Sequence, residues 1–273
     1  MEYLKFYGFE FEPFANHPDP KFYFNSPQHA LAREYLLHAA RGTRGLAVLL
    51  GDIGTGKTTL ARKILSELYS SNKFQVGLIV LTQSDFTPAW LFIRIANLIG
   101  LRDLNTSTTE VISRISQRLN EIYHRGEKTV IIIDEANKIK NSETLEEIRG
   151  LLNLEIADTR LISFILSGLP ELEPFLAANR ALYQRIAIKV KLKPMGSDTV
   201  KNYINHRLMV VGTTKEIFSP PAVDLICRYS EGRPRLVNTI CDNALLEGYL
   251  QRRQAIDESI IERVASNLGL KLE

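Results

Sequence analysis

The segment Gly51–Thr58, which reads Gly-Asp-Ile-Gly-Thr-Gly-Lys-Thr, constrains the fold of this chain more than any other feature. Its glycines permit a tight loop in which successive backbone N–H groups point at one anion. The loop follows a short apolar run at 46–50 and precedes an amphipathic stretch at 58–69. This order of strand, loop and helix places the positive end of the helix dipole at the loop, and therefore predicts a phosphate-binding site.

The spacing of this segment matches the Walker A pattern G-x-x-x-x-G-K-[ST] in full. In that pattern the lysine, here Lys57, reaches the β- and γ-phosphates, and the hydroxyl of Thr58 ligates Mg²⁺. The predicted nucleotide-binding residues are Gly51, Asp52, Ile53, Gly54, Thr55, Gly56, Lys57, Thr58 and Thr59. The expected ligands are ATP and Mg²⁺.

A second apolar run, at 130–134, ends in the adjacent acids Asp134 and Glu135. This pattern is typical of a Walker B strand, in which Asp134 would hold the metal and Glu135 would polarise the attacking water. A water-activating glutamate favours an ATPase over a kinase for a small metabolite. The alternative is a buried strand followed by two solvated acids at a helix start. The tetrad at 134–137 is also similar to the DEAD/H helicase box, but a helical region stands where a helicase has a second RecA-like domain.

Apolar strands alternate with helical patterns through the middle of the chain. Strands are expected at 46–50, 76–81, 130–134, 161–166 and 187–192. Unbroken apolar strands alternating with helices predict an α/β fold with a parallel sheet covered on both faces. Beyond Pro194 four helical segments follow, at 196–211, 220–230, 234–251 and 257–268. We therefore expect an arm and first helix at 1–41, a P-loop domain at 42–194 and a small helical lid at 195–273.

The first 25 residues are unusually aromatic. Nine rings are present: Tyr3, Phe6, Tyr7, Phe9, Phe11, Phe14, Phe22, Tyr23 and Phe24. Three prolines lie among them, and proline interrupts helices, so an irregular arm pinned by its rings is expected. Two interpretations of the rings are open. In the first, Tyr23 or Phe22 packs near the adenine of the nucleotide. In the second, which is favoured, most of the rings cover an exposed face of the sheet.

The composition excludes several classes of protein. Hydrophobic residues make up 45% of the chain, which argues against global disorder. The sequence has no apolar run of about 18 residues and no signal-peptide pattern, so no transmembrane segment is expected. Two cysteines cannot build a disulfide framework, which favours a cytoplasmic protein. The net charge of +3 permits contact with nucleic acid without demanding it.

Several segments together resemble AAA+ ATPases of the initiator-like branch: the tandem acids, the helical region after the sheet, and GRPR at 232–235. More narrowly, FYGFEFEPF, HPDPKFYF, SPQHALA, LSGLPEL and GRPRLVNTICDNALL resemble the general-secretion-pathway ATPases of the ExeA/GspA type. MSHA-pilus ATPases and, more distantly, TniB/TnsC-type transposon ATPases are similar. The resemblance implies an AAA+ P-loop NTPase fold and a nucleotide-dependent homo-oligomer, either a ring or a filament.

The resemblance also implies a polar sensor beside the γ-phosphate at the end of strand 161–166. Ser167 is the best candidate for it, because similar sequences often carry glutamine where this chain has Leu169. The alternative for Ser167 is an ordinary strand-end serine.

Two arginine roles are implied in the same way. The first role is an arginine finger that reaches the nucleotide of a neighbouring subunit. Arg185 is the candidate and Arg180 competes with it; the alternative for either arginine is a surface ion pair. A lid sensor corresponds to Arg235, with Arg233 as the second choice and a solvated helix surface as the alternative.

Two functions are compatible with these features. The first is a secretion- or pilus-pathway ATPase, cytoplasmic or peripheral at the inner membrane, that controls assembly of an envelope complex. The second is a transposon-encoded ATPase that selects target sites on duplex DNA with a transposase, although no dense Lys/Arg stripe supports strong DNA binding. ExeA-type proteins continue into a membrane span and a periplasmic region. Both a stand-alone relative and a part of a longer protein therefore remain open.

Overall fold

The computed structural model describes residues 2–272, which form two compact units. The first, here the sheet unit, comprises Pro27–Gly51 and Lys57–Leu192. The second, here the helical unit, comprises the residues up to Ser26, Asp52–Gly56 and the residues from Lys193 onward. This division differs from the predicted grouping of 1–41, because the arm belongs to one unit and the first long helix to the other. None of the helices in residues 2–272 has the length and apolar character needed to cross a membrane.

The sheet unit contains the predicted parallel sheet, with five strands in the order β2-β3-β6-β1-β7. The strands are β1 (Leu46–Gly51), β2 (Phe74–Val80), β3 (Lys128–Asp134), β6 (Ile162–Gly168) and β7 (Ile186–Leu192). Every residue of β1 and β6 is buried, which requires cover on both faces of the sheet. Because β6 lies between β1 and β3, the carboxyl ends of these three strands are neighbours.

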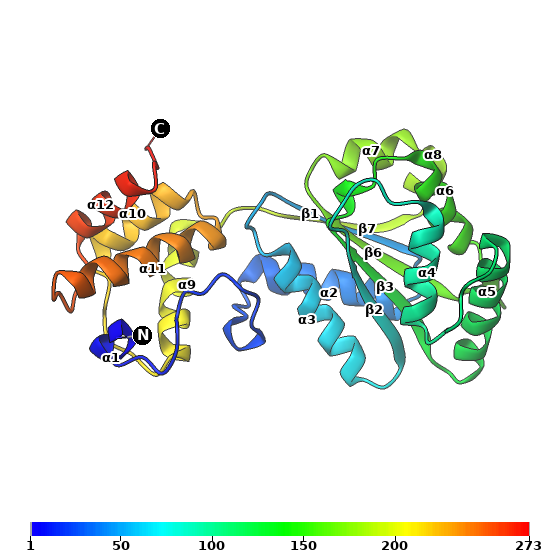
Figure 1. Cartoon of the computed structure of the whole chain (residues 1–273), viewed down its shortest axis with the longest axis horizontal. Coiled ribbons are helices and arrows are strands. Elements are labelled where there is room, and N and C mark those ends of the chain that lie inside the picture. Colours follow the sequence, from blue (N-terminus) through cyan, green and yellow to red (C-terminus); the bar gives the residue numbers. More distant parts are fainter. Residues whose placement is uncertain (1, 273) are drawn as a thin grey trace. The chain divides into compact units, whose positions relative to one another are not determined.

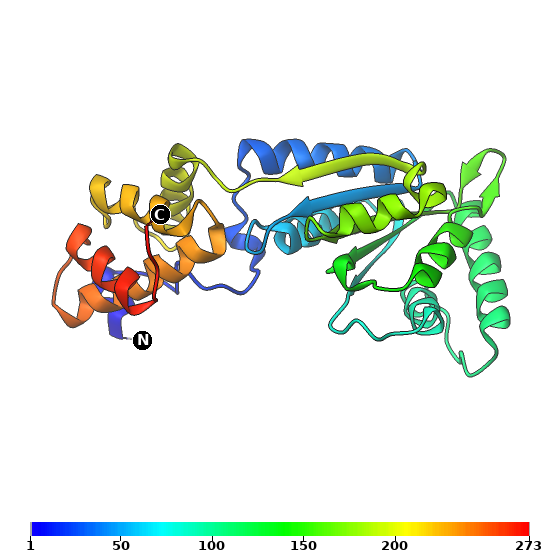
Figure 2. The ribbon, with the colours of Figure 1, turned by 90° about the horizontal axis from the view of Figure 1, so that it is seen from above.

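Helices flank this sheet (Figures 1 and 2). They are α2 (Pro27–Arg41), α3 (Lys57–Ser70), α4 (Pro88–Leu98), α5 (Thr108–His124), α6 (Ser142–Leu151), α7 (Leu172–Ala178) and α8 (Arg180–Tyr183). A 3₁₀ turn, η2 (Ala136–Lys138), follows β3, and a short hairpin joins β4 (Glu155–Ile156) to β5 (Thr159–Arg160).

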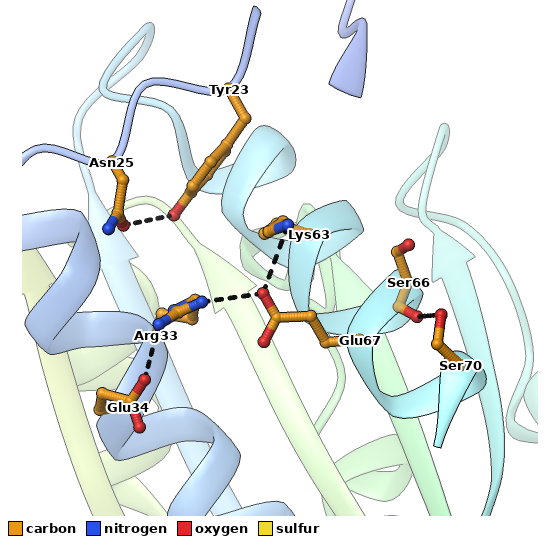
Figure 3. Close-up of polar contacts among 8 residues, drawn as sticks. All are labelled: Tyr23, Asn25, Arg33, Glu34, Lys63, Ser66, Glu67 and Ser70. Atoms are coloured by element: carbon orange, nitrogen blue, oxygen red, sulfur yellow. Dashed lines mark hydrogen bonds and ion pairs between the residues drawn. The ribbon is translucent and has the colours of Figure 1, made fainter. Parts of the chain in front are cut away.

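Helix α2 belongs to the sheet unit because it packs on β7 and β6 and beside α3. Arg33 of α2 donates a hydrogen bond to Glu67 of α3 at 3.0 Å, as Figure 3 shows. Lys63 approaches the same carboxylate oxygen at 3.5 Å. The helix begins at Pro27, where proline is well tolerated because its missing N–H has no helical acceptor. These contacts explain why the chain divides after Ser26.

The helical unit contains the four helices expected after Pro194: α9 (Ser197–Val210), α10 (Pro220–Ser230), α11 (Pro234–Leu250) and α12 (Glu258–Asn267). It also contains α1 (Glu2–Tyr7) and the 3₁₀ turn η1 (Pro20–Phe22), both from the arm. Residues 2–7 were expected to be irregular, but the first proline comes only at Pro13. Tyr3 and Tyr7, four residues apart, share one buried side of α1.

The aromatic arm forms part of the core of the helical unit. Its buried rings are Tyr3, Tyr7, Phe9, Phe14 and Phe22, and they belong to the same apolar cluster as residues of α9–α12. The interpretation that most rings cover the sheet is therefore wrong. Figure 1 shows α1 beside α11, and the Tyr7 hydroxyl donates to the carbonyl of Arg253 at 3.0 Å. Burial raises the pKa of Tyr7 to about 12, which keeps this donor protonated.

Arg207 of α9 holds the middle of the arm. Its guanidinium donates to the carbonyls of Pro13 and Ala15, the latter at 3.0 Å, and to the Tyr203 hydroxyl at 3.1 Å. It also lies 4.0 Å from the centroid of the Phe22 ring. Because Arg207 is only 5% exposed, each of these contacts replaces hydration that the buried charge has lost.

The turn between α10 and α11 depends on Gly232. Its φ of +69° is one that side-chain-bearing residues rarely adopt, and a Cβ there would lie 1.9 Å from the Met195 carbonyl oxygen. The Met195 N–H donates to the Gly232 carbonyl at 2.7 Å. This close approach fixes where α11 begins at Pro234, and with it the position of Arg235 within the helical unit.

We expect Arg207→Ala to lower the free energy of unfolding by about 3 kcal/mol, because it leaves two carbonyls without their charged donor. Urea unfolding followed by circular dichroism measures the loss. Arg228→Ala removes an exposed arginine from α10 and serves as the control, with a change within about 0.5 kcal/mol. Equal effects of the two substitutions would contradict the anchoring role.

We expect Gly232→Ala to destabilise the protein far more than Gly269→Ala. The two glycines have φ of +69° and +68°, but nothing lies within 4 Å of a Cβ at Gly269. Gly269→Ala should therefore cost only the backbone strain, about 1–2 kcal/mol. Gly232→Ala adds the collision with Met195. Thermal unfolding of both variants compares them, and similar midpoints would show that the close approach is unimportant.

Candidate nucleotide-binding site

The predicted site residues of the sheet unit converge at the carboxyl ends of β1, β3 and β6. The parallel pairing sets Leu49 of β1 beside Ser167 of β6, and Ile133 of β3 beside Leu166. Asp134, the residue after Ile133, therefore lies level with Ser167. In an open parallel sheet, ligands bind at this edge, where the strand order changes direction.

Asp134 is the centre of this arrangement. Its carboxylate is fully buried, and each of its two oxygens accepts one hydrogen bond from a hydroxyl group. Thr58, in the first turn of α3, donates to Oδ2 at 2.7 Å, and Ser167 donates to Oδ1 at 2.7 Å. The structure thus brings together three of the residues that the sequence singled out, and it fixes the orientation of the carboxylate between them.

The oxygen donors of Thr58 and Asp134 suit a hard cation such as Mg²⁺. Within residues 2–272, no three His, Cys, Asp or Glu side chains come together in a group that could hold a metal ion. Mg²⁺ is usually bound in proteins through one or two carboxylates together with substrate phosphates and waters. The donor set therefore fits a cation that arrives with a nucleotide.

Glu135 adopts the left-handed backbone conformation, with φ of 57° and ψ of 34°. This conformation is uncommon for residues other than glycine and persists only where the surrounding structure holds it. It turns the chain out of β3 immediately after Asp134. The carboxylate of Glu135 is half-buried and makes no hydrogen bond or ion pair with residues 2–272, so it is available to a water molecule.

The glycine-rich loop joins β1 to α3. Gly54 and Gly56 have φ of +78° and +99°, which side-chain-bearing residues rarely adopt. The Thr55 hydroxyl donates to the Asp52 carbonyl at 2.8 Å and stiffens the loop. Gly51 ends β1, and Lys57, Thr58 and Thr59 begin α3, whose N-terminus carries the positive end of the helix dipole.

Arg235 contacts the glycine-rich loop, whose residues Asp52–Gly56 are grouped with the helical unit. The N–H of Arg235 donates to the Gly54 carbonyl at 3.3 Å, and a Cβ on Gly54 would lie 2.9 Å from the Arg235 Cβ. The Arg235 side chain is exposed and has no ion pair within residues 2–272. Arg233, by contrast, pairs with Glu231 at 2.7 Å. Arg235 is therefore the more available of the two arginines.

The remaining candidates form no hydrogen bond or ion pair with Asp134 in the described part of the chain. Arg185, between α8 and β7, is half-buried, and Arg180, at the start of α8, is exposed. Neither side chain forms a hydrogen bond or ion pair in the described part of the chain, so the structure leaves the choice between them open.

Phe22 is covered by Arg207 and by the ring of Phe11, and its ring is therefore not open to an adenine. The Tyr23 hydroxyl donates to Asn25 at 3.5 Å (Figure 3).

Asn137 is a residue of this region to which the sequence assigned no role. It is buried in η2, and its side-chain oxygen accepts a hydrogen bond from the backbone N–H of Leu169 at 3.1 Å. The only signal in the sequence was its place in the tetrad at 134–137, which by itself does not reveal a partner 32 residues away.

Comparisons with known proteins identify the family and the fold of this chain. The family described as AAA domain matches residues 40–176, half of the chain. The General secretion pathway protein A of Aeromonas hydrophila is 32% identical over 250 residues, which is 90% of this chain and 45% of that protein. The chain thus spans less than half the length of this relative.

Two solved structures show the same fold. The Aeropyrum pernix ORC2 protein has a TM-score of 0.68 and 18% identity, covering 93% of this chain and 71% of its own. A chain from the structure of Drosophila ORC bound to DNA has a TM-score of 0.73 and 16% identity, covering 98% of this chain and 66% of its own. Because the family match spans the strands that carry Asp134 and Ser167 and the loop before Thr58, this chain belongs to the AAA domain family, with the ExeA/GspA-type resemblance that its sequence predicted.

Proposed function

We propose that this protein binds and hydrolyses ATP with Mg²⁺ and uses the cycle to control assembly of a larger complex. The observation that carries the proposal is the Asp134 carboxylate, held by the hydroxyls of Thr58 and Ser167 beside the unpaired carboxylate of Glu135. An oriented metal ligand adjacent to a candidate base is the arrangement that hydrolysis of a phosphoanhydride requires.

Each residue has a defined role in this proposal. The loop at 51–59 and Lys57 hold the phosphates, and Thr58 and Asp134 hold Mg²⁺, which when bound neutralises phosphate charge. Glu135 orients a water and accepts its proton. Ser167 acts as the sensor, because its hydroxyl already contacts the carboxylate that holds the metal.

Two arginines complete the proposal. Arg235 senses nucleotide from the helical unit, supported by its contact with Gly54 and by its unpaired side chain. Arg185 reaches the nucleotide of a neighbouring copy, as in AAA+ oligomers, with Arg180 as the competing choice. Nucleotide state would then control the geometry of a homo-oligomeric ring or filament.

The biological process that we propose is secretion or pilus assembly. The 32% identity with General secretion pathway protein A over 90% of this chain supports it. The complex acted upon would lie in the cell envelope, with this chain cytoplasmic or peripheral at the inner membrane.

A second candidate function is ATP-dependent binding of duplex DNA together with a transposase. Two observations favour it: the net charge of +3, and the fold shared with an ORC chain whose structure was solved bound to DNA. An oligomer can pool the modest charge of several copies against DNA phosphates.

We expect Lys57→Ala to abolish ATP binding, and Glu135→Gln to bind ATP but to hydrolyse it about 10²–10⁴-fold more slowly, because the base is lost while the phosphate cradle remains. Binding of a fluorescent ATP analogue and release of inorganic phosphate measure the two properties. Glu143→Gln, an exposed acid in the first turn of α6, is the matched control and should behave like the parent. Hydrolysis by Glu135→Gln at the parent rate would remove Glu135 from its role.

Fluorescence anisotropy of a labelled DNA duplex separates the two candidate processes. The protein is titrated with a slowly hydrolysed ATP analogue at two salt concentrations, with Lys57→Ala and nucleotide-free protein as controls. The secretion proposal expects no binding at physiological salt while ATPase activity is intact. Tight binding that requires both the analogue and Lys57, and that weakens with salt, would favour the DNA function instead.

A further inference from the structure

The loop after Glu135 is bonded to the loop after Ser167. Asn137 is 8% exposed, and its Oδ1 accepts the hydrogen bond from the Leu169 N–H at 3.1 Å. Three residues before Asn137 and two residues before Leu169, the Ser167 hydroxyl donates to Asp134 at 2.7 Å. Two hydrogen bonds, one on either side of Glu135 in sequence, therefore connect the ends of β3 and β6.

The two loops also approach closely at Gly168. A Cβ on this glycine would lie 3.0 Å from both the backbone nitrogen and the Oδ1 of Asn137. Such a distance is tighter than ordinary van der Waals contact, so a side chain at position 168 would require Asn137 to shift by a few tenths of an ångström. The absence of a side chain lets the Asn137 amide lie against the backbone of β6.

The opposite side of the Glu135 loop is anchored as well. Lys138 donates to the Thr82 carbonyl in the loop after β2 at 2.9 Å, and the Leu81 N–H donates to the Asp134 carbonyl at 3.1 Å. The left-handed backbone of Glu135 is thus held between bonds to the ends of both neighbouring strands. Strained conformations of this kind need such support to persist.

We propose that Asn137 is a positioning residue that locks the Ser167–Leu169 loop to the Glu135 loop, so that the sensor hydroxyl and the candidate base keep one relative position. The inference rests on the proposed ATPase function and deepens it. Asn137 acts through the Leu169 backbone and not on the nucleotide. Its loss should therefore slow turnover without weakening ATP binding, which the glycine-rich loop supplies.

The test uses Asn137→Ala in the full chain. We expect kcat for ATP hydrolysis to fall by about 10- to 100-fold, because small misplacements of catalytic groups cost rates of this size, while the Kd for ATP stays within about twofold. In nucleotide-free protein, amide hydrogen exchange at Leu169 should accelerate by about tenfold or more, because its acceptor is gone.

Asn141→Ala is the matched control. Asn141 lies four residues further on, and its Oδ1 accepts from the Thr144 N–H at 2.9 Å, a bond of the same kind that caps α6 and does not involve β6. This variant should lose comparable stability, with kcat and Leu169 exchange unchanged. Equal loss of kcat in both variants, or parent-like kcat in Asn137→Ala, would overturn the proposal.

Gly168→Ala tests the same lock from the other side, and replaces Asn137→Ala if that variant does not fold. Its added Cβ should shift Asn137 and give the same pattern of lower kcat with retained ATP affinity. The exchange measurement is independent of activity. A parent protein that binds ATP without hydrolysing it would contradict the proposed function, whereas unchanged Leu169 exchange in Asn137→Ala would contradict the lock itself.

Discussion

The Asp134 carboxylate and its two hydroxyl donors are the interaction on which the site depends. A fully buried carboxylate is costly unless hydrogen bonds replace its lost hydration, and the Thr58 and Ser167 hydroxyls supply them. These donors come from α3 and β6. Because the buried Asp134 carboxylate requires both hydrogen bonds, it holds the start of α3 and the carboxyl ends of β3 and β6 together. The insertion of β6 between β1 and β3 makes this meeting possible. The proposed base, Glu135, is the residue that comes immediately after Asp134 at the end of β3.

The helical unit has its own organising interaction, the burial of the arm. Arg207 donates to two arm carbonyls and stacks on Phe22, while five arm rings join the core of α9–α12. The arm is thus structurally a part of the helical unit, although α2 and the whole sheet unit follow it in sequence. The position of the proposed lid sensor, Arg235, is determined within the same unit, because the turn at Gly232 fixes the start of α11.

The parts of the fold that could be predicted are those specified by local patterns. Apolar runs located the ends of the five parallel strands to within two residues, and the glycine-rich loop located the start of α3 to within one residue. The arm could not be placed, because apolar rings indicate burial without naming the surface that buries them. The helix at residues 2–7 was missed because prolines further along were given weight over the spacing of Tyr3 and Tyr7. Asn137 was missed because its partner is a backbone N–H on another strand end.

The sequence by itself determined the candidate groups of the site: the glycine-rich loop that we propose cradles phosphates, the acids that follow an apolar strand, and the family to which they belong. These are local features, since a few adjacent residues specify both the backbone conformation and the functional groups. Only the tertiary structure decided which of these groups meet. Residues far apart in the chain are joined by the strand order, by the two hydroxyl groups that donate to Asp134, and by the hydrogen bond from Leu169 to Asn137. Such contacts arise from the packing of whole elements, because the sequence pattern of one strand carries no information about its neighbour in the sheet.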